Sequence, residues 1–189
     1  MTMSCRAFYH DKTPGDPSIS HDPSRKVSLE ILRTLKYDTY FIDGPDYVPH
    51  SRKFAREQGF LVPVENSKVI WDFVGAENTW NFSKSSKLSL SSNKPSKYIA
   101  SLDILMVVVS GMHCIDIEDP ISNSWIRIER GPGTVQLIPS GSILYFVPSI
   151  HKSIVFIKGI QSEYQVFRDE DAKLLALHRG YRKRIGLSS

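Results

Sequence analysis

The chemistry open to this chain depends first on its six histidines, because imidazole binds metals and moves protons near neutral pH. They are His10, His21, His50, His113, His151 and His178. No two of them stand in an HxH or HxxxH pattern, so the sequence does not indicate a metal site built from neighbouring ligands on one element.

One combination of distant residues could still form a displaced triad. A carboxylate and an imidazole five residues apart, Glu118 and His113, could converge across a turn and be joined by His151. We favour another interpretation, because an odd separation points strand side chains to opposite faces. His113 and Glu118 would then face apart, and His151 would lie in a loop after Pro148.

Two basic segments are the other candidates for binding. The net charge is only +4 with a pI near 9.0, but residues 83–97 contain no acid, and basic residues also gather near the C-terminus. The candidates are Lys84, Lys87, Lys94, Lys97, Arg179, Arg182, Lys183 and Arg184. Such side chains can bind RNA or DNA phosphates by releasing counterions. The simpler interpretation is that lysines in a serine-rich loop keep that loop solvated.

The elements that must position these residues are mostly strands. Short β-rich segments with turn residues between them predict a closed or nearly closed barrel. The expected strands are Val69–Phe73, Lys97–Val109, Met112–Glu118, Ser124–Glu129, Thr134–Pro139, Ile143–Val147 and Ser153–Ile157. Helices are expected from an N-cap at Ser28 to about Lys36, over Ser51–Gln58, and over Asp169–Gly180.

Length and composition indicate one domain. At 189 residues and 41% hydrophobic content, the chain can bury a core without disulfides. We expect a domain over residues 1–189, with a loop-rich N-terminal arm (1–27) and a Ser/Lys-rich insertion (about 83–97). Cys5 and Cys114 indicate free thiols, and no apolar run is long enough to span a membrane. These features favour a cytoplasmic and/or nuclear protein without membrane contact, and leave organelle import open.

The spacing of certain glycine and proline residues indicates a more specific kind of β-barrel. Gly133, Pro139 and Gly141 have the spacing of the second cupin motif, which runs G, five residues, P, one residue, G, two residues, H. Leu144 stands at the final histidine. The first cupin motif, counted back from Gly111, places its His, His and Glu at Tyr98, Ala100 and Ile104. The chain therefore resembles a cupin, and this resemblance implies a mainly β, jelly-roll-like barrel with a few short helices at its N- and C-terminal ends.

Within the cupins, five longer segments of the chain resemble the acireductone dioxygenase family in sequence. They are Ala7–Asp11, Pro14–Pro17, Val27–Leu32, Gly111–Asp119 and Trp125–Ile128, and the resemblance fails chiefly between about Glu65 and Lys97. It implies an enzyme of methionine salvage that holds Fe(II) or Ni(II) with three imidazoles and a carboxylate. The family's substrate-contacting arginine lies two residues after that carboxylate, a position that Met106 fills here.

The side chains at the ligand positions lead us to expect that the metal is absent. Alanine, isoleucine and leucine have no donor atoms, and a lone phenol with a pKa near ~10 is a poor ligand at neutral pH. If the strand is continuous, Tyr98, Ala100, Leu102 and Ile104 share one face, which has become apolar. We expect these side chains to fill the space that the metal site would occupy.

The expectation for function follows from this interpretation. We expect a catalytically inactive cupin without a cofactor, acting as a non-catalytic binding or scaffold subunit of a larger protein or ribonucleoprotein assembly, with a protein partner of unknown identity. The first alternative is a metal-dependent acireductone dioxygenase with a rearranged or residual site, which would need Fe or Ni. The second alternative is a nucleic-acid-associated cupin that uses the basic segments.

Overall fold

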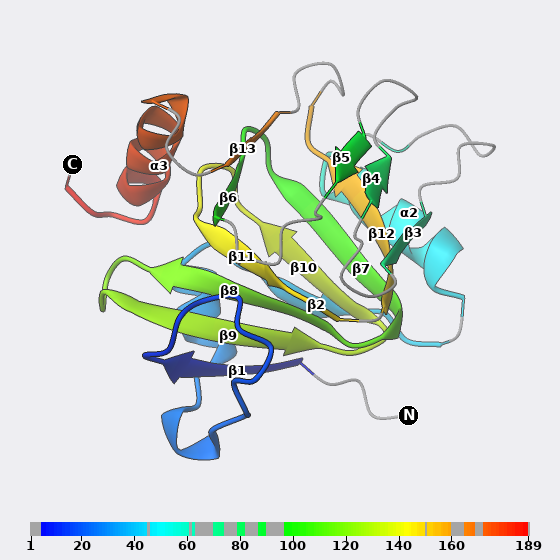
Figure 1. Cartoon of the computed structure of the whole chain (residues 1–189). Helices are drawn as coiled ribbons and strands as arrows, with labels where there is room; N and C mark the ends of the chain where they lie inside the picture. Colours follow the sequence, from blue (N-terminus) through cyan, green and yellow to red (C-terminus); the bar gives the residue numbers. More distant parts are fainter. Residues whose placement is uncertain are drawn as a thin grey trace.

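Two antiparallel sheets face each other in the computed structural model of the chain (Figure 1). It describes residues 5–44, 46–60, 62, 70–73, 79–81, 87–89, 97–149, 151–159, 165–168 and 172–188. The first sheet contains, in spatial order, β1 (Cys5–His10), β9 (Ser124–Arg130), β8 (His113–Asp119), β11 (Leu144–Val147), β6 (Lys97–Ala100) and β13 (Val166–Arg168). The second contains β2 (Thr39–Phe41), β10 (Thr134–Ile138), β7 (Ile104–Gly111), β12 (His151–Ile157) and β3 (Ile70–Phe73).

The remaining elements lie outside these two sheets. Strands β4 (Thr79–Asn81) and β5 (Lys87–Ser89) form a separate two-stranded sheet. The helices are η1 (Pro23–Arg25), α1 (Leu29–Thr34), α2 (Tyr47–Glu57) and α3 (Ala172–Arg184). In Figure 1, α2 lies beside β12 and β3, and α3 lies at the opposite side of the barrel, next to β13 and β6. The expected mainly β, cupin-like barrel with short helices is confirmed.

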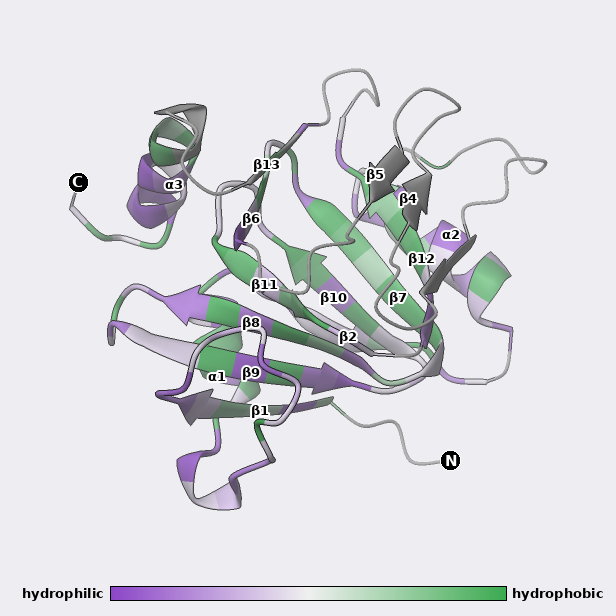
Figure 2. Cartoon of the chain, viewed as in Figure 1, coloured by the Kyte–Doolittle hydropathy of each residue, from purple (hydrophilic) through white to green (hydrophobic). Residues whose placement is uncertain are grey.

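The main core lies between the two sheets. Alternate residues of β8 and β9, such as Ile115 and Ile128, meet alternate residues of β7 and β12, such as Met106 and Val155. A second apolar cluster, with Ala55 of α2 and Leu105 of β7, lies between α2 and the outer face of the second sheet. Figure 2 shows the resulting hydrophobic colour along β7 and β12.

All three expected helices form, with bounds that differ from the expected ones by up to four residues. Ser28 is the N-cap of α1, and its hydroxyl accepts a hydrogen bond from the Ile31 amide at 3.3 Å. Helix α2 begins at Tyr47, four residues before the expected start, because Pro49 is tolerated in the first turn, where an amide has no helical partner. The last helix runs past Gly180 to Arg184, since one exposed glycine weakens a helix without ending it.

The predicted strand Lys97–Val109 is wrong as a single element. The chain forms β6 up to Ala100, leaves strand geometry at residues 101–103, and enters the other sheet as β7 at Ile104. The crossing is fixed by hydrogen bonds to Asp103, whose backbone carbonyl accepts from the Lys158 amide at 2.9 Å and whose carboxylate accepts from the Ser140 amide at 2.8 Å.

The N-terminal arm also differs from the expected loop. Its first part is the strand β1, which pairs with β9 along its whole length, with Cys5 opposite Arg130 and His10 opposite Trp125. Residues 11–26, called the arm segment below, then cross the outer face of β8 and β9 (Figure 1). The short alternation from Cys5 to His10 was hidden in the sequence by the prolines that follow it.

Candidate functional site

The positions that motif spacing assigns to metal ligands come together in the barrel interior. Leu144 of β11 pairs with Tyr98 of β6, and these two residues join Ala100 and Ile104 in the main core. All four are buried, and the Tyr98 ring packs edge-on against Phe146 with ring centroids 5.0 Å apart. We call this group of four residues the apolar end.

The apolar end does not fit a divalent metal of the kind that the cupin motif implies. Three of its four side chains carry only carbon, whereas such a metal takes imidazole and carboxylate ligands. Within the described parts of the chain, no group of three or more His, Cys, Asp and Glu side chains lies close enough together to hold a metal ion.

A second group of inward-facing residues is polar. Ile126 and Ile128 of β9 face the core, so Arg130 at the next alternate position also points inward, and its Cα partner on β8 is His113. From the opposite sheet, the same alternation brings in Gln136 beside Met106, and Ser153 beside Val108. The group, called the polar end, contains His113, Arg130, Thr134, Gln136, His151 and Ser153, each no more than 5% exposed.

Arg130 is the centre of the polar end. Its Nη2 donates to His113 Nδ1 and contacts the Met106 sulfur at 3.6 Å. The His113 ring in turn lies edge-on to the His151 ring, with centroids 4.2 Å apart. Because Arg130 donates to His113 Nδ1, the proton of a neutral His113 ring lies on Nε2.

The protonation of the polar end follows from its burial. Burial, with Arg130 nearby, lowers the pKa of His113 well below 6.5 and that of His151 to about 4. Both rings are therefore neutral at pH 7. Burial also lowers the pKa of Arg130, to about 10, which leaves the guanidinium charged at neutral pH. The polar end thus holds one buried positive charge.

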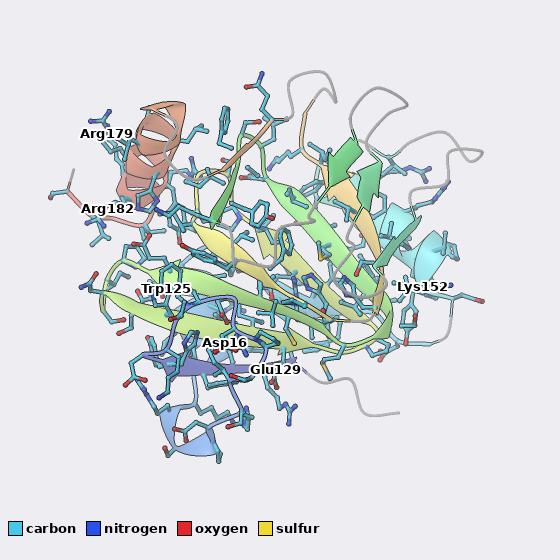
Figure 3. All side chains as sticks on the ribbon, viewed as in Figure 1. Asp16, Trp125, Glu129, Lys152, Arg179 and Arg182 are labelled. Carbon is cyan, nitrogen blue, oxygen red and sulfur yellow. The ribbon has the colours of Figure 1, made fainter. Side chains whose placement is uncertain are left out.

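A different buried arginine lies on the outer face of the same strand. Arg127 binds Asp116 with two hydrogen bonds, of 2.7 Å from Nε and 2.8 Å from Nη2, and donates to the Asp16 and Ile19 carbonyls of the arm segment. The Gly15 amide and His10 add further contacts to Asp116, at 2.6 Å and 3.3 Å. Figure 3 shows Asp16 on the arm segment, over these strands.

A pocket of about 470 Å³ lies between β1 and the arm segment. Its lining includes His10, Lys12, Asp16 and Arg25. Within it, Arg25 contacts Asp11 at 3.5 Å, and the Asp16 carboxylate accepts from the Ser18 amide at 2.8 Å. Charges of both signs therefore lie along this wall, and much of their hydrogen bonding stays within the arm segment.

Of the three members of the possible triad, the structure brings His113 and His151 together and keeps Glu118 apart from them. His113 and Glu118 face apart as expected, since Glu118 pairs on the outside with His178 of α3 at 3.2 Å. The expected loop position of His151 is wrong, because it is the first residue of β12 and meets His113 inside the barrel. Arg130 was missed because the predicted strand stopped at Glu129. The alternation of Ile126, Ile128 and Arg130 would have placed it inside.

The basic candidates lie in separate places. Lys84 and Lys94 fall outside the described residues, as does the Lys87 side chain, while Lys97 is half-buried at the start of β6. The other candidates, Arg179, Arg182, Lys183 and Arg184, are on α3. Arg179 and Arg182 lie at the edge of the molecule (Figure 3), and Arg184 donates to the Ser140 carbonyl. Nucleic-acid contact through these residues stays a prediction. No helix in the described ranges has the length and apolarity needed to cross a bilayer.

Comparison with known proteins gives three similar sequences or structures of interest, although no protein-family model matches the chain. It is 28% identical to acireductone dioxygenase 1 of Coprinopsis cinerea over 97% of this chain and 99% of that protein. The human acireductone dioxygenase is 26% identical over 72% of each chain. The structure of a Bacillus anthracis acireductone dioxygenase, with cadmium in its active centre, is similar in fold, with a TM-score of 0.50 and 11% identity over 83% of this chain and 94% of that one.

These relatives contradict the expectation of a catalytically inactive scaffold subunit. A chain that matches a named dioxygenase over nearly the whole length of both proteins is better explained as an enzyme than as a structural subunit. The apolar side chains at the motif's ligand positions led to the wrong expectation, because they describe one end of the barrel interior only. That interpretation did not consider the residues of the polar end.

Proposed function

Because the chain belongs to the acireductone dioxygenase family, we propose that it acts on an acireductone and dioxygen through a rearranged site at the polar end of the barrel. Similarity to a named acireductone dioxygenase over nearly the full length of both chains supports the reaction class. The polar end supports the location, since it is where charged and hydrogen-bonding groups gather inside this barrel.

The observation that carries this proposal is the contact between Arg130 and Met106. The family resemblance implies a substrate-contacting arginine at the position of Met106. In this chain the arginine comes from β9 instead of β7, and its Nη2 lies 3.6 Å from the Met106 sulfur. A guanidinium is therefore still supplied to this part of the interior, from the facing sheet.

The polar end has the groups that an acireductone needs. An acireductone is an enediol conjugated to a carbonyl, so it loses a proton to give a delocalised anion. A buried guanidinium stabilises that anion by a charge-assisted hydrogen bond. His151 is neutral at pH 7, because burial lowers its pKa to about 4, so it brings no second positive charge to this space.

The metal that the family implies is not assigned to these residues. The side chains at the motif's ligand positions do not fit Fe(II) or Ni(II), and a guanidinium in contact with His113 disfavours a second cation beside it. The chain's own residues account for binding of the substrate anion and for stabilisation of its charge.

The test is turnover of an acireductone generated under anaerobic conditions and then mixed with oxygenated buffer. The decrease in substrate absorbance and the uptake of oxygen are both measured, first with the purified protein alone, then with added Fe(II), and then with added Ni(II). We expect protein-dependent consumption that Arg130→Met reduces by about 10- to 100-fold, the effect of removing a charged hydrogen bond.

The matched control is Arg6→Met, which removes an arginine from β1 whose partner Glu129 lies on the outer face. It should leave turnover unchanged. Consumption equal to the protein-free rate in all three metal conditions would show that the proposed function is wrong.

A further inference from the structure

The polar end has a charge that the described residues do not balance. Arg130 is fully buried, and two carboxylates of the same sheet are engaged with other arginines on the outer face: Glu129 with Arg6 at 2.8 Å, and Asp116 with Arg127 at 2.7 Å. The thiol of Cys5, its neighbour on β1, stays protonated at neutral pH because burial raises its pKa.

Hydrogen bonding at the polar end is also incomplete. Two of the three guanidinium nitrogens of Arg130, Nε and Nη1, have no partner among the described residues. The same holds for the buried hydroxyls of Thr134 and Ser153. All of these groups can donate a hydrogen bond, and buried donors without acceptors are costly.

One buried group adds an acceptor to these donors. Gln136 donates through Nε2 to the Tyr37 carbonyl at 2.9 Å and to the Thr39 hydroxyl at 2.9 Å, which leaves its Oε1 without a partner among the described residues. Gln136 pairs with Met106, and Met106 touches Arg130. A ligand that fits this set has negative oxygens for the donors and one hydroxyl for Gln136.

We propose that the polar end binds one small organic monoanion, a carboxylate or an enediolate that also carries a hydroxyl group, with Arg130 as its counter-charge. A single positive charge calls for a single negative one, and the neutral rings of His113 and His151 add no further charge. The identity of the natural ligand as an acireductone rests on the proposed function, whereas the anion site does not.

An anion bound at Arg130 also accounts for an arginine on β9 in place of one on β7. Arg130 and Met106 touch across the interior, so an arginine at either position brings a guanidinium to the same space. Arg130→Met removes the charge, and Met106→Arg with Arg130→Met returns it from the opposite sheet. The double exchange keeps both side chains of the pair and changes only which strand carries which.

The experiment measures binding to the metal-free full-length protein by calorimetry and by the shift in thermal midpoint. The probes are glycolate, a hydroxy-carboxylate, and ascorbate, a stable enediolate monoanion, with glycolamide as the neutral control. We expect one of the two anions to bind at one site per chain and glycolamide not to bind. Arg130→Met should weaken the binding by about 10- to 100-fold, and the double exchange should restore it to within about tenfold of the starting protein.

Each outcome decides the proposal. Tighter binding of glycolate would identify the ligand's acidic group as a carboxylate, and tighter binding of ascorbate would identify it as an enediol. Loss of binding in Arg130→Met with unchanged binding in Arg6→Met supports the anion site at Arg130. If neither anion binds the starting protein, or if Arg130→Met binds as well as it does, the anion site is wrong. Anion binding without acireductone turnover would contradict the proposed function alone, and turnover without Arg130-dependent binding would contradict this inference alone.

Discussion

Arg127 and Arg130 lie three residues apart in one strand, are both buried, and have opposite surroundings. On the outer face, Arg127 has Asp116 as counter-ion and two backbone carbonyls of the arm segment as further acceptors. On the inner face, Arg130 has a neutral imidazole and a thioether, and two of its nitrogens have no partner among the described residues. A protein stabilised by both arginines would satisfy both, so the difference supports our proposal that Arg130 binds a ligand, whereas Arg127 stabilises the fold.

The largest loss of stability should come from removing Arg127, the arginine whose guanidinium nitrogens all have hydrogen-bond partners. Arg127→Met leaves Asp116 buried without its counter-ion and frees the arm segment. We expect the free energy of unfolding to fall by about 3–5 kcal/mol. Urea denaturation followed by far-UV circular dichroism measures this change.

The matched variant Arg130→Met should behave in the opposite way. It replaces an uncompensated buried charge by an apolar side chain of similar length, so stability without ligand should be unchanged or higher. A loss comparable to that of Arg127→Met would show that Arg130 also stabilises the fold, and would remove the contrast between the two faces.

The two ends of the interior can be compared in the same way. Ile104→Glu puts a carboxylate into the apolar end, where Ile104 is 4% exposed and packed in the main core. We expect a loss of roughly 3 kcal/mol, less if the new group stays protonated. Thermal and urea midpoints measure it, and Ile121→Glu, at a site 53% exposed, is the control that should change little. An unchanged Ile104→Glu variant would mean that this position reaches solvent.

The apolar end was the part of the interior that the sequence predicted well. Gly111, Gly133, Pro139 and Gly141 fix turns, and counting from them placed Tyr98, Ala100, Ile104 and Leu144 in one core even though the strand between them is broken. Turn residues restrict the backbone locally, so their spacing survives in the sequence as a readable frame.

The polar end was not predicted, because its members come from strands far apart in the sequence. His113, Arg130 and His151 belong to three strands, and the register of β8 with β9, together with the start of β12 at His151, brings them together. The Gly131-Pro-Gly133 turn made Arg130 look like a loop residue. Cross-strand register is set by tertiary packing, which one sequence does not display.

The two faces should also titrate in separate pH ranges. His151 has a folded-state pKa of about 4, below the value near 6.5 expected after unfolding, so the unfolded chain binds the proton first as the pH falls. Its contribution is complete above about pH 6.5 and is lost toward pH 4, by about 2–3 kcal/mol at pH 4.5. Because burial also lowers the pKa of His113 well below 6.5, His151→Gln should reduce the slope of unfolding free energy against pH in this range, and His151→Gln combined with His113→Gln should flatten it.

The outer face gives the contrasting range. Burial raises the pKa of Asp116, but hydrogen bonds from Arg127, His10 and the Gly15 amide outweigh it, and the net pKa lies below 3.8. The stability that Asp116 contributes is therefore present above about pH 4 and is lost only as the pH falls through the folded-state pKa. Asp116→Asn should alter the profile below pH 4, and a slope at pH 4–6.5 that persists when His113 and His151 are both replaced by Gln would contradict the assignment of that range to the interior.

The smallest loss of stability should come from a change in the backbone of the arm segment, whose carbonyls accept hydrogen bonds from Arg127. Gly15 has a φ of 85° and its amide donates to Asp116 at 2.6 Å, so Gly15→Ala strains the turn of the arm segment without removing either charge. We expect a loss of about 1 kcal/mol from the left-handed conformation. Gly44→Ala, with a φ of 88° and open space at its Cβ position, should cost a similar amount and is the matched control.

Proteolysis separates these two glycine variants. A loosened arm segment exposes the trypsin sites at Lys12, Arg25 and Lys26, so Gly15→Ala should be cleaved there faster than Gly44→Ala at equal global stability. Binding of glycolate or ascorbate at the polar end should be the same in both variants, because Arg130 faces the interior and takes no acceptor from the arm segment. Weaker anion binding in Gly15→Ala alone would mean that the outer network also positions Arg130, and that the two arginines of β9 act as one unit.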